Sequence, residues 1–275
     1  MTQLIIEHDL ETVELPPQSA PLTARSLSVV IPIYNEQEIL RHTVVTVLAG
    51  VRPLDLKFFE ILLCENGSQD DTLEIARQLE AEIAEVRVIV LEEADYGKAM
   101  RAGFLASRGE AVVNFDADYY DLDFLTAALK VDGDVVVAAK GLAGSDDARV
   151  LTRRIVSRSF GWLVRHILNV KVTETHGMKL WHRPVIAPLV LQVGSSKDIF
   201  DTELIARAEW SGLAIRELPI RTEELRHSRS GILRRIPRTM LGLVQMRYRL
   251  RAIHALRIRP ELTRVPNADR SRIAA

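Results

Sequence analysis

The sequence has a single cysteine, no long hydrophobic run and no excess of either charge. Cys64, at the end of the apolar run FFEILLC, cannot form an internal disulfide or a cysteine-based zinc cluster, and we expect it to be a buried structural thiol. No apolar stretch approaches the roughly 20 residues that cross a bilayer. The N-terminal segment lacks a basic start followed by an apolar core, so it is not predicted to be a secretory signal. We therefore expect a cytoplasmic protein.

Overall charge does not point to a partner. The chain has 36 Lys and Arg against 37 Asp and Glu, a formal net charge of -1, and we expect no nucleic-acid partner. The charge is nevertheless segregated, because residues 1–22 are acidic while residues 232–259 carry many arginines and no carboxylate. We expect residues 1–24 and 260–275 to be flexible tails.

The pattern of apolar runs predicts an α/β protein. With 275 residues, 47% of them hydrophobic, the chain can bury a sizeable core. Continuous β-branched runs alternate with amphipathic stretches, which is typical of parallel strands buried on both faces and connected by helices. Strands are predicted at 27–33, 59–64, 86–92, 111–115, 134–139, 176–183 and 214–220. Helices are predicted at 36–50, 70–83, 97–109, 122–130, 150–169 and 199–212.

Polar residues follow four of the predicted strands. They are Tyr34–Glu36, Glu65–Ser68, Glu93–Lys98 and Asp116–Asp118. In open parallel sheets, ligands bind beyond the carboxyl ends of the strands. We expect these four loops to cluster at one edge of the sheet.

Asp116 and Asp118 follow the apolar run AVVNF with one small residue between them. On an extended chain, residues two apart point the same way, so both carboxylates would face one point. Such a pair suits Mg²⁺ or Mn²⁺, which prefer oxygen ligands and share them with phosphate oxygens. The alternative is a polar turn, with Asp121 capping the next helix. For an isolated Asp-x-Asp the turn is the commoner case.

The other loops favour the metal site. Asn35 and Glu36 stand at a strand-to-helix turn, and Glu65 ends the next strand, where a carboxylate can accept a hydrogen bond from a nucleobase imino group. Gly67 suits a tight turn. Each motif is weak alone, but their order and spacing together are hard to obtain by chance.

The sequence resembles the inverting family 2 glycosyltransferases, which have the nucleotide-sugar-binding GT-A fold. The resemblance rests on SVVIPIYNEQEIL, ILLCENGSQDDT, YGKAMRAGFLASRGEAVVNFDADYY, THGMKLWHR and FDTELIARAEWSGLAIRELPIRTEELRHSRSG, and it covers Leu27 to Gly231. The late segments look most like polyprenyl-phosphate sugar transferases, the group of the dolichyl-phosphate mannose and glucose synthases. The resemblance implies a single GT-A domain at 25–231, with a mostly parallel central sheet flanked by helices, and a basic helical segment at 232–259.

The resemblance also implies roles for individual residues. Asp116 and Asp118 match the metal and diphosphate motif, with Mg²⁺ or Mn²⁺ as cofactor. Asp118 and Asp201 are the implied catalytic residues, Asp201 lying where related enzymes place a carboxylate near the acceptor. The implied donor-binding residues are Pro32, Tyr34, Asn35, Glu36, Glu65, Asn66, Ser68, Gly97, Lys98, Asp116, Ala117 and Asp118.

An anionic acceptor beside an anionic donor needs positive charge, and guanidinium groups grip phosphate oxygens in bidentate fashion. The candidates are Arg149, Arg153, Arg226 and Arg229, with Ser230 beside them. The alternative is that these side chains lie on solvated helix or loop faces. The basic segment 232–259 has apolar residues at helical spacing, which suits either an anionic membrane surface or packing on the core.

These observations lead to a functional expectation. The resemblance leads us to expect that the protein transfers one hexose, mannose or glucose, from a UDP- or GDP-sugar to a polyprenyl phosphate with inversion, in the cytoplasm or at the inner face of the membrane. The family usually has two aspartates where this chain has Glu65 and Asn66, so the choice of base stays open. Two alternatives remain: a soluble hydroxyl or glycan acceptor, and a non-catalytic nucleotide-sugar-binding scaffold.

Overall fold

A computed structural model describes residues 25–140, 146–147, 151–195, 199–222 and 241–249. The chain divides into two compact units, Met1–Gly231 and Ile232–Ala275. The expected tails, 1–24 and 260–275, lie outside the described residues. In the second unit the described residues, 241–249, are helical. Across the described part of the chain, no helix is both long and apolar enough to cross a membrane.

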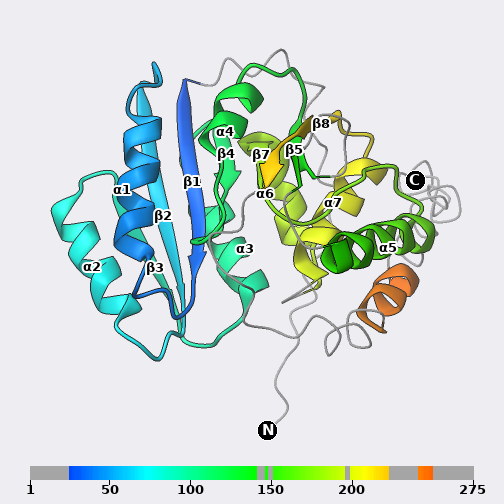
Figure 1. Cartoon of the computed structure of the whole chain (residues 1–275), viewed down its shortest axis with the longest axis horizontal. Helices are drawn as coiled ribbons and strands as arrows, with labels where there is room; N and C mark the ends of the chain where they lie inside the picture. Colours follow the sequence, from blue (N-terminus) through cyan, green and yellow to red (C-terminus); the bar gives the residue numbers. More distant parts are fainter. Residues whose placement is uncertain (1–24, 141–145, 148–150, 196–198, 223–240, 250–275) are drawn as a thin grey trace, which may run out of the picture. The chain divides into compact units, whose positions relative to one another are not determined.

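The first unit alternates strands and helices for most of its length (Figure 1). The strands are β1 (Ser26–Ile33), β2 (Phe58–Asn66), β3 (Val86–Leu91), β4 (Ala111–Asn114), β5 (Val135–Ala139), β6 (Asp146–Asp147), β7 (Lys179–His182), β8 (Ile215–Pro219) and β9 (Arg221–Thr222). The helices are α1 (Leu40–Val51), α2 (Thr72–Glu82), α3 (Tyr96–Ala106), α4 (Leu122–Ala128), α5 (Leu151–Leu168), α6 (Arg183–Gln192) and α7 (Phe200–Trp210).

The main sheet has seven strands in the order β3-β2-β1-β4-β7-β5-β8, and β6 pairs with β9 in a separate ribbon. β1 to β4 are mutually parallel, and β5 is parallel to β8. β7 runs antiparallel between β4 and β5. Its register pairs Asn114, the last residue of β4, with Lys179, the first residue of β7. The amino end of β7 therefore lies at the edge where the parallel strands have their carboxyl ends.

Helices cover both faces of this sheet. On one face, apolar side chains of α1, α2 and α4 join alternate residues of β1, β2 and β4 in one buried core. α3 packs on the other face, where it contacts β1 and β2 and meets α6 and α7. Gly103 permits this contact, since a Cβ there would lie 2.4 Å from Val30 and 2.7 Å from Cys64. Cys64 is buried and burial raises the pKa of its thiol to about 12, which confirms the expected structural role.

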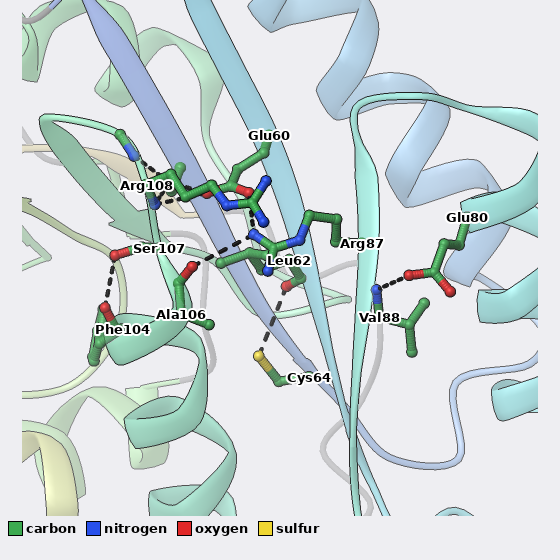
Figure 2. Close-up of polar contacts among 12 residues, drawn as sticks. Glu60, Leu62, Cys64, Glu80, Arg87, Val88, Phe104, Ala106, Ser107 and Arg108 are labelled. Atoms are coloured by element: carbon green, nitrogen blue, oxygen red, sulfur yellow. Dashed lines mark hydrogen bonds and ion pairs between the residues drawn. The ribbon is translucent and has the colours of Figure 1, made fainter.

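A buried carboxylate, Glu60, joins neighbouring strands at the amino edge of the sheet. Glu60, near the start of β2, is 2% exposed and accepts hydrogen bonds from Ser28 Oγ at 2.7 Å and from the backbone N–H of Arg108 at 2.8 Å. The Arg87 guanidinium lies 2.6 Å from its other oxygen (Figure 2). These contacts tie the starts of β1, β2 and β3 to the turn before β4.

Each strand and helix predicted from the sequence is present, with ends that differ by a few residues. Three features were not predicted. β7 is antiparallel, because it returns to the sheet between two parallel strands. Helix α6 was missed because Pro188 interrupts the apolar run from Val185 to Leu191, although Pro184 in its first turn is a common start signal. The short β6–β9 ribbon carries no signal of its own in the sequence.

Candidate active site

Hydrogen bonds join the β1–α1 and β2–α2 loops. Asn35 adopts a left-handed backbone conformation with φ of 55°, and its side-chain oxygen accepts from the backbone N–H of Gln69 at 2.8 Å. The Asn35 N–H donates to Ser68 Oγ at 3.1 Å, and the Glu36 N–H donates to Thr72 Oγ1 at 2.8 Å. The predicted donor residues Asn35, Glu36 and Ser68 are therefore one connected unit. The same two loops line an open, mostly polar depression formed by Asn35, Gln37, Glu38, Gln69 and Asp70.

Glu65 closes its own turn. Its carboxylate accepts from the backbone N–H groups of Gly67 at 3.2 Å and Ser68 at 2.5 Å, and Gly67 has a positive φ of 72°. The Glu65 side chain is 2% exposed. In this structure the carboxylate therefore shapes the loop, a role that the expectation of a contact with the nucleobase did not include.

Asn66 connects this loop to the next one. Its side-chain oxygen accepts from the backbone N–H of Asp95 at 2.7 Å, and Asp95 in turn caps α3 by accepting from the Lys98 N–H at 3.0 Å. The Lys98 ammonium lies 3.0 Å from Glu93, with both side chains well exposed, so this pair adds little stability. Gly97 is buried in the first turn of α3.

Asp116 and Asp118 lie in a tight turn and not on an extended strand, so the extended-chain argument for their shared direction was wrong. β4 ends at Asn114, and the backbone groups of Asp116 and Tyr119 then exchange hydrogen bonds at 3.0 and 3.2 Å. The turn is also fixed from outside, because Thr43 Oγ1 of α1 donates to the Ala117 carbonyl at 2.6 Å. The expected cap of α4 by Asp121 is present at 2.8 Å.

The Asp116 carboxylate stands in an unfavourable electrostatic environment. Burial, then the negative charges of Asp201 and Asp118, raise its pKa to about 7, although Lys179 and Lys140 oppose the shift. Within the part of the chain that the structure describes, no three His, Cys, Asp or Glu side chains are grouped closely enough to hold a metal ion. The two carboxylates offer the oxygen ligands that a divalent cation prefers, and further ligands would have to come from a bound substrate such as a diphosphate.

Asp201, at the start of α7, lies beside this turn. Tyr96 Oη donates to Asp201 Oδ2 at 2.9 Å, and Lys179 Nζ lies 3.7 Å from Asp201 Oδ1. Lys179 is fully buried, and its ammonium also donates to the Gly177 carbonyl at 2.8 Å. Burial, then the charges of Asp201 and Asp116, raise the pKa of Tyr96 well above its usual value, so its hydroxyl stays protonated. Two lysines, Lys179 and Lys140, and three carboxylates thus interact at the carboxyl edge of the sheet.

The segment before β7 also contributes to the surroundings of Asp201. Asn114 Nδ2 donates to the Gly177 carbonyl at 3.1 Å, while Asn114 Oδ1 and Asp201 Oδ1 are buried and have no hydrogen-bond partner among the described residues. Gly177 has a positive φ of 83°. Thr175 Oγ1 lies 3.2 Å from Thr202 Oγ1, which connects this segment to α7.

Some predicted residues are not placed. Arg149, Arg226, Arg229 and Ser230 lie outside the described residues. Arg153 is in α5, but its side chain is not described. The acceptor-phosphate site therefore stays a prediction.

Two residues that the sequence reading did not single out, Lys179 and Tyr96, hold central positions. Polar residues were sought after each strand, but Lys179 opens an antiparallel strand, so it precedes the strand it belongs to. The signal available was a lysine inside the apolar stretch MKLW. Tyr96 was part of the loop EADYGK, and only the fold brings it to Asp201, 105 residues later.

Solved structures share this arrangement of strands and helices. Glucosyl-3-phosphoglycerate synthase from Mycobacterium tuberculosis, crystallised with Mn²⁺, UDP-glucose and phosphoglyceric acid, is 19% identical with a TM-score of 0.57, covering 81% of this chain and 79% of that one. Mannosyl-3-phosphoglycerate synthase from Rubrobacter xylanophilus is 17% identical with a TM-score of 0.56, covering 88% and 78%. The fold is therefore the GT-A fold of glycosyltransferases.

The sequence comparisons identify the family. Residues 28–175 match Glycosyl transferase family 2, and the chain belongs to that family. Glycosyltransferase AglD of Haloferax volcanii is 30% identical over 90% of this chain, and dolichyl-phosphate β-glucosyltransferase of Drosophila melanogaster is 28% identical over 79% of it. The chain spans 40% of the length of the first relative and 73% of the second. The expected family and fold class are thus confirmed.

Proposed function

We propose that this protein transfers a single hexose, glucose or mannose, from a nucleotide diphosphate sugar to a polyprenyl phosphate, with inversion and with the help of Mg²⁺ or Mn²⁺. The observation that carries the proposal is the Asp116 carboxylate, whose pKa burial and the charges of Asp201 and Asp118 raise to about 7 despite Lys179 and Lys140, at the edge where the four loops meet. The acceptor class is supported by the relatives, one of which is named a dolichyl-phosphate glucosyltransferase. Another, 36% identical over 36% of this chain, is named undecaprenyl-phosphate 4-deoxy-4-formamido-L-arabinose transferase, from Pseudomonas savastanoi, so it shares the class of acceptor but its name gives a different sugar.

The connected loops would bind the nucleotide. The β1–α1 and β2–α2 loops offer Tyr34, half exposed, and the polar depression beside Asn35. Since Glu65 and Asn66 already hold backbone groups, their part in nucleotide binding is to keep the loops in place. Preformed loops reduce the entropy lost on binding.

Asp116 and Asp118 would hold the metal ion together with the donor diphosphate. A divalent cation bound there stabilises the negative charge that develops on the departing nucleotide diphosphate. The protein contributes the placement of the two carboxylates, which the turn closed by Tyr119 and the bond from Thr43 fix before substrate arrives. If the acceptor is a phosphate, it is ionised at neutral pH and needs no strong general base. Asp201 would then orient the acceptor side of the site.

The test is a transfer assay with the purified chain. It is incubated with Mg²⁺ or Mn²⁺, a polyprenyl phosphate, and UDP-glucose, UDP-galactose, GDP-mannose or GDP-glucose in turn, and lipids are analysed by mass spectrometry. The expected result is a hexosyl-phosphate polyprenol from one donor, with loss of product on chelation of the metal. NMR of the product assigns the anomeric configuration, which is opposite to that of the donor if the reaction inverts.

Two results would decide against the proposal. Transfer to a water-soluble hydroxyl acceptor, with no lipid product, would show that the acceptor is a soluble hydroxyl compound or glycan instead. Tight donor binding without turnover in any combination, while a control synthase works in the same tube, would favour a nucleotide-sugar-binding scaffold.

A further inference from the structure

Asp201 is held from two sides by residues of two other elements. Tyr96, the first residue of α3, donates to Oδ2 at 2.9 Å. Lys179, the first residue of β7, places its ammonium 3.7 Å from Oδ1, beyond hydrogen-bond distance but within reach of a strong charge interaction. Because α3, β7 and α7 are separate elements, the orientation of this carboxylate is fixed by the tertiary fold.

Lys179 is an unusual residue to bury. Within the described part of the chain it and Arg207 are the buried basic side chains, and Lys179 is 0% exposed. A buried ammonium is costly unless it is paired and hydrogen-bonded. Its hydrogen bond goes to the Gly177 carbonyl, and its charge faces Asp201. This location places the Lys179 ammonium beside Asp201 at the carboxyl edge of the sheet.

The ion pair of Arg207, which lies on the same helix as Asp201, differs from the Lys179–Asp201 pair. Its guanidinium makes hydrogen bonds of 2.9 and 2.7 Å to Glu203 Oε1, and Glu203 also accepts from the backbone N–H groups of Gly194 and Ser195. That pair is well satisfied and lies among structural contacts. The Lys179–Asp201 pair is long, and Asp201 Oδ1 has no hydrogen bond. An internal pair that served stability alone would be expected to close to hydrogen-bond distance.

We propose that Tyr96 and Lys179 are positioning residues of the active site. Tyr96 fixes the direction of the Asp201 carboxylate toward the acceptor side, and Lys179 supplies the positive charge that allows Asp201 and Asp116 to lie near one another before metal and donor bind. The inference rests on the proposed function for the role of Asp201, while the role of Lys179 as counter-ion is independent of which substrates are used.

The first experiment tests Tyr96 by kinetics. Tyr96→Phe removes one hydroxyl and keeps the ring, so the fold is retained, as circular dichroism and the melting temperature will check. We expect kcat to fall about 10-fold to 100-fold, the range seen when a partner that orients a site carboxylate or ligand is removed, with the donor KM changed by less than about threefold. A kcat within about twofold of wild type, for a protein that melts normally, overturns the role of Tyr96.

The second experiment tests Lys179 without an activity assay. Lys179→Met keeps much of the side-chain volume and removes the charge. Without it the site holds three carboxylates and no buried cation, so added Mn²⁺ should compensate for the loss. Binding of Mn²⁺ to the folded state adds stability. We expect the shift in melting temperature caused by 1 mM Mn²⁺ to be about twice as large in Lys179→Met as in wild type.

Arg87→Met is the matched control. It also removes a cation from a buried carboxylate, Glu60, but at the amino edge of the sheet. We expect it to lower the melting temperature without changing the response to Mn²⁺. Equal Mn²⁺ responses in wild type, Lys179→Met and Arg87→Met overturn the counter-ion role. So does a Lys179→Met protein that stays unfolded with and without Mn²⁺, since a cation then cannot replace the lost charge.

The two arms separate this inference from the proposed function. If wild type shows no transfer with any donor and acceptor, the proposed function fails and the role of Tyr96 in that reaction fails with it. The Mn²⁺ experiment still decides whether Lys179 is the counter-ion of the site. If wild type is active and Tyr96→Phe is equally active, only the positioning role is lost.

Discussion

The two edges of the sheet place a carboxylate in different surroundings: Glu60 is buried at the amino edge, and Asp116 is partly buried at the carboxyl edge. At the amino edge, Glu60 accepts from Ser28 and Arg108 and pairs with Arg87 at 2.6 Å. At the carboxyl edge, the Asp116 carboxylate meets two further negative charges, and its pKa is raised to about 7 by burial and by those charges. A buried charge that is fully hydrogen-bonded serves the fold, whereas a carboxylate whose pKa is raised by neighbouring negative charges marks a candidate site that a ligand can complete.

The difference extends to the residues around each carboxylate. The groups that satisfy Glu60 belong to strand starts and to the turn before β4, so the cluster is made mostly by neighbouring strands. The groups near Asp116 come from α3, β7 and α7, which lie far apart in sequence. Substitutions at the two edges should therefore separate stability from activity.

Asp118→Ala should have the largest effect. It removes one of the two carboxylates assigned to the metal, so the negative charge on the leaving diphosphate loses its stabilisation. We expect transfer activity to fall by at least about 100-fold, with little change in the melting temperature. The measurement is product formation at saturating donor, with differential scanning fluorimetry alongside. Activity within a factor of a few of wild type would remove Asp118 from the mechanism.

Glu60→Gln should give the opposite pattern. The substitution leaves Arg87 without its counter-charge and places an amide among N–H donors that need an acceptor. We expect a loss of about 1–3 kcal/mol in the free energy of unfolding and a kcat per folded molecule like that of wild type. Urea unfolding followed by circular dichroism measures the first quantity and the transfer assay the second. A large drop in kcat without loss of stability would show that the amino edge is not purely structural.

The sequence was enough to predict the architecture and the clustering of the strand-end loops at one edge of the sheet. Buried β-branched runs fixed the positions of the parallel strands, and the carboxyl-edge rule then pointed to Asn35, Glu65 and the Asp116–Asp118 turn. That rule applies to parallel strands only. It could not find Lys179, which enters the site from an antiparallel strand whose direction no local pattern reveals.

The second limit on prediction from the sequence was the choice of hydrogen-bond partner for each polar side chain. The sequence suggested that Glu65 faces a ligand, but its oxygens accept backbone N–H groups of its own turn. Carboxylates bind backbone donors and nucleobase donors with the same geometry, so the pattern of residues does not distinguish them. The hydrogen bond from Tyr96 to Asp201 depends on the packing of α3 against α7, which single-sequence periodicity does not specify.

Asp116→Asn should show how much the ionised Asp116 carboxylate lowers the stability of the folded protein. In the folded state the pKa of Asp116 is raised to about 7 from an ordinary value near 3.8, so the folded protein holds this proton more tightly than the unfolded chain does. Stability is therefore unaffected by this group below about pH 4 and declines as the pH rises from about 4 to about 7. In metal-free buffer at pH 8 we expect the variant to melt about 2–4 °C above wild type, an effect of about 1 kcal/mol.

The control for this prediction is the same pair of proteins at low pH. At about pH 3, Asp116 is protonated in both the folded and the unfolded chain, so the melting temperatures of the two proteins should nearly coincide. Saturating Mg²⁺ at pH 8 should also reduce the difference, since it stabilises wild type. A variant that is less stable than wild type at pH 8 would show that the Asp116 charge is already compensated.

Asn66→Ala should have the smallest effect. It removes the acceptor for the buried N–H of Asp95, which connects the second and third loops. We expect a loss of about 1 kcal/mol in stability and a rise of a few-fold in the donor KM, with kcat unchanged, because the loops lose part of their preorganisation. Initial rates across donor concentrations test this. Unchanged donor KM would mean that the two loops bind the donor independently.

The most direct test of the account is a titration of Mn²⁺ followed by electron paramagnetic resonance of the free ion, with UDP or GDP present or absent. The account predicts that wild type binds one Mn²⁺, that the matching nucleoside diphosphate tightens this binding about tenfold or more, and that both Asp116→Asn and Asp118→Asn abolish it. Binding of Mn²⁺ that is unchanged in both variants, or insensitive to either nucleotide, would contradict a metal and diphosphate site at the carboxyl edge of the sheet.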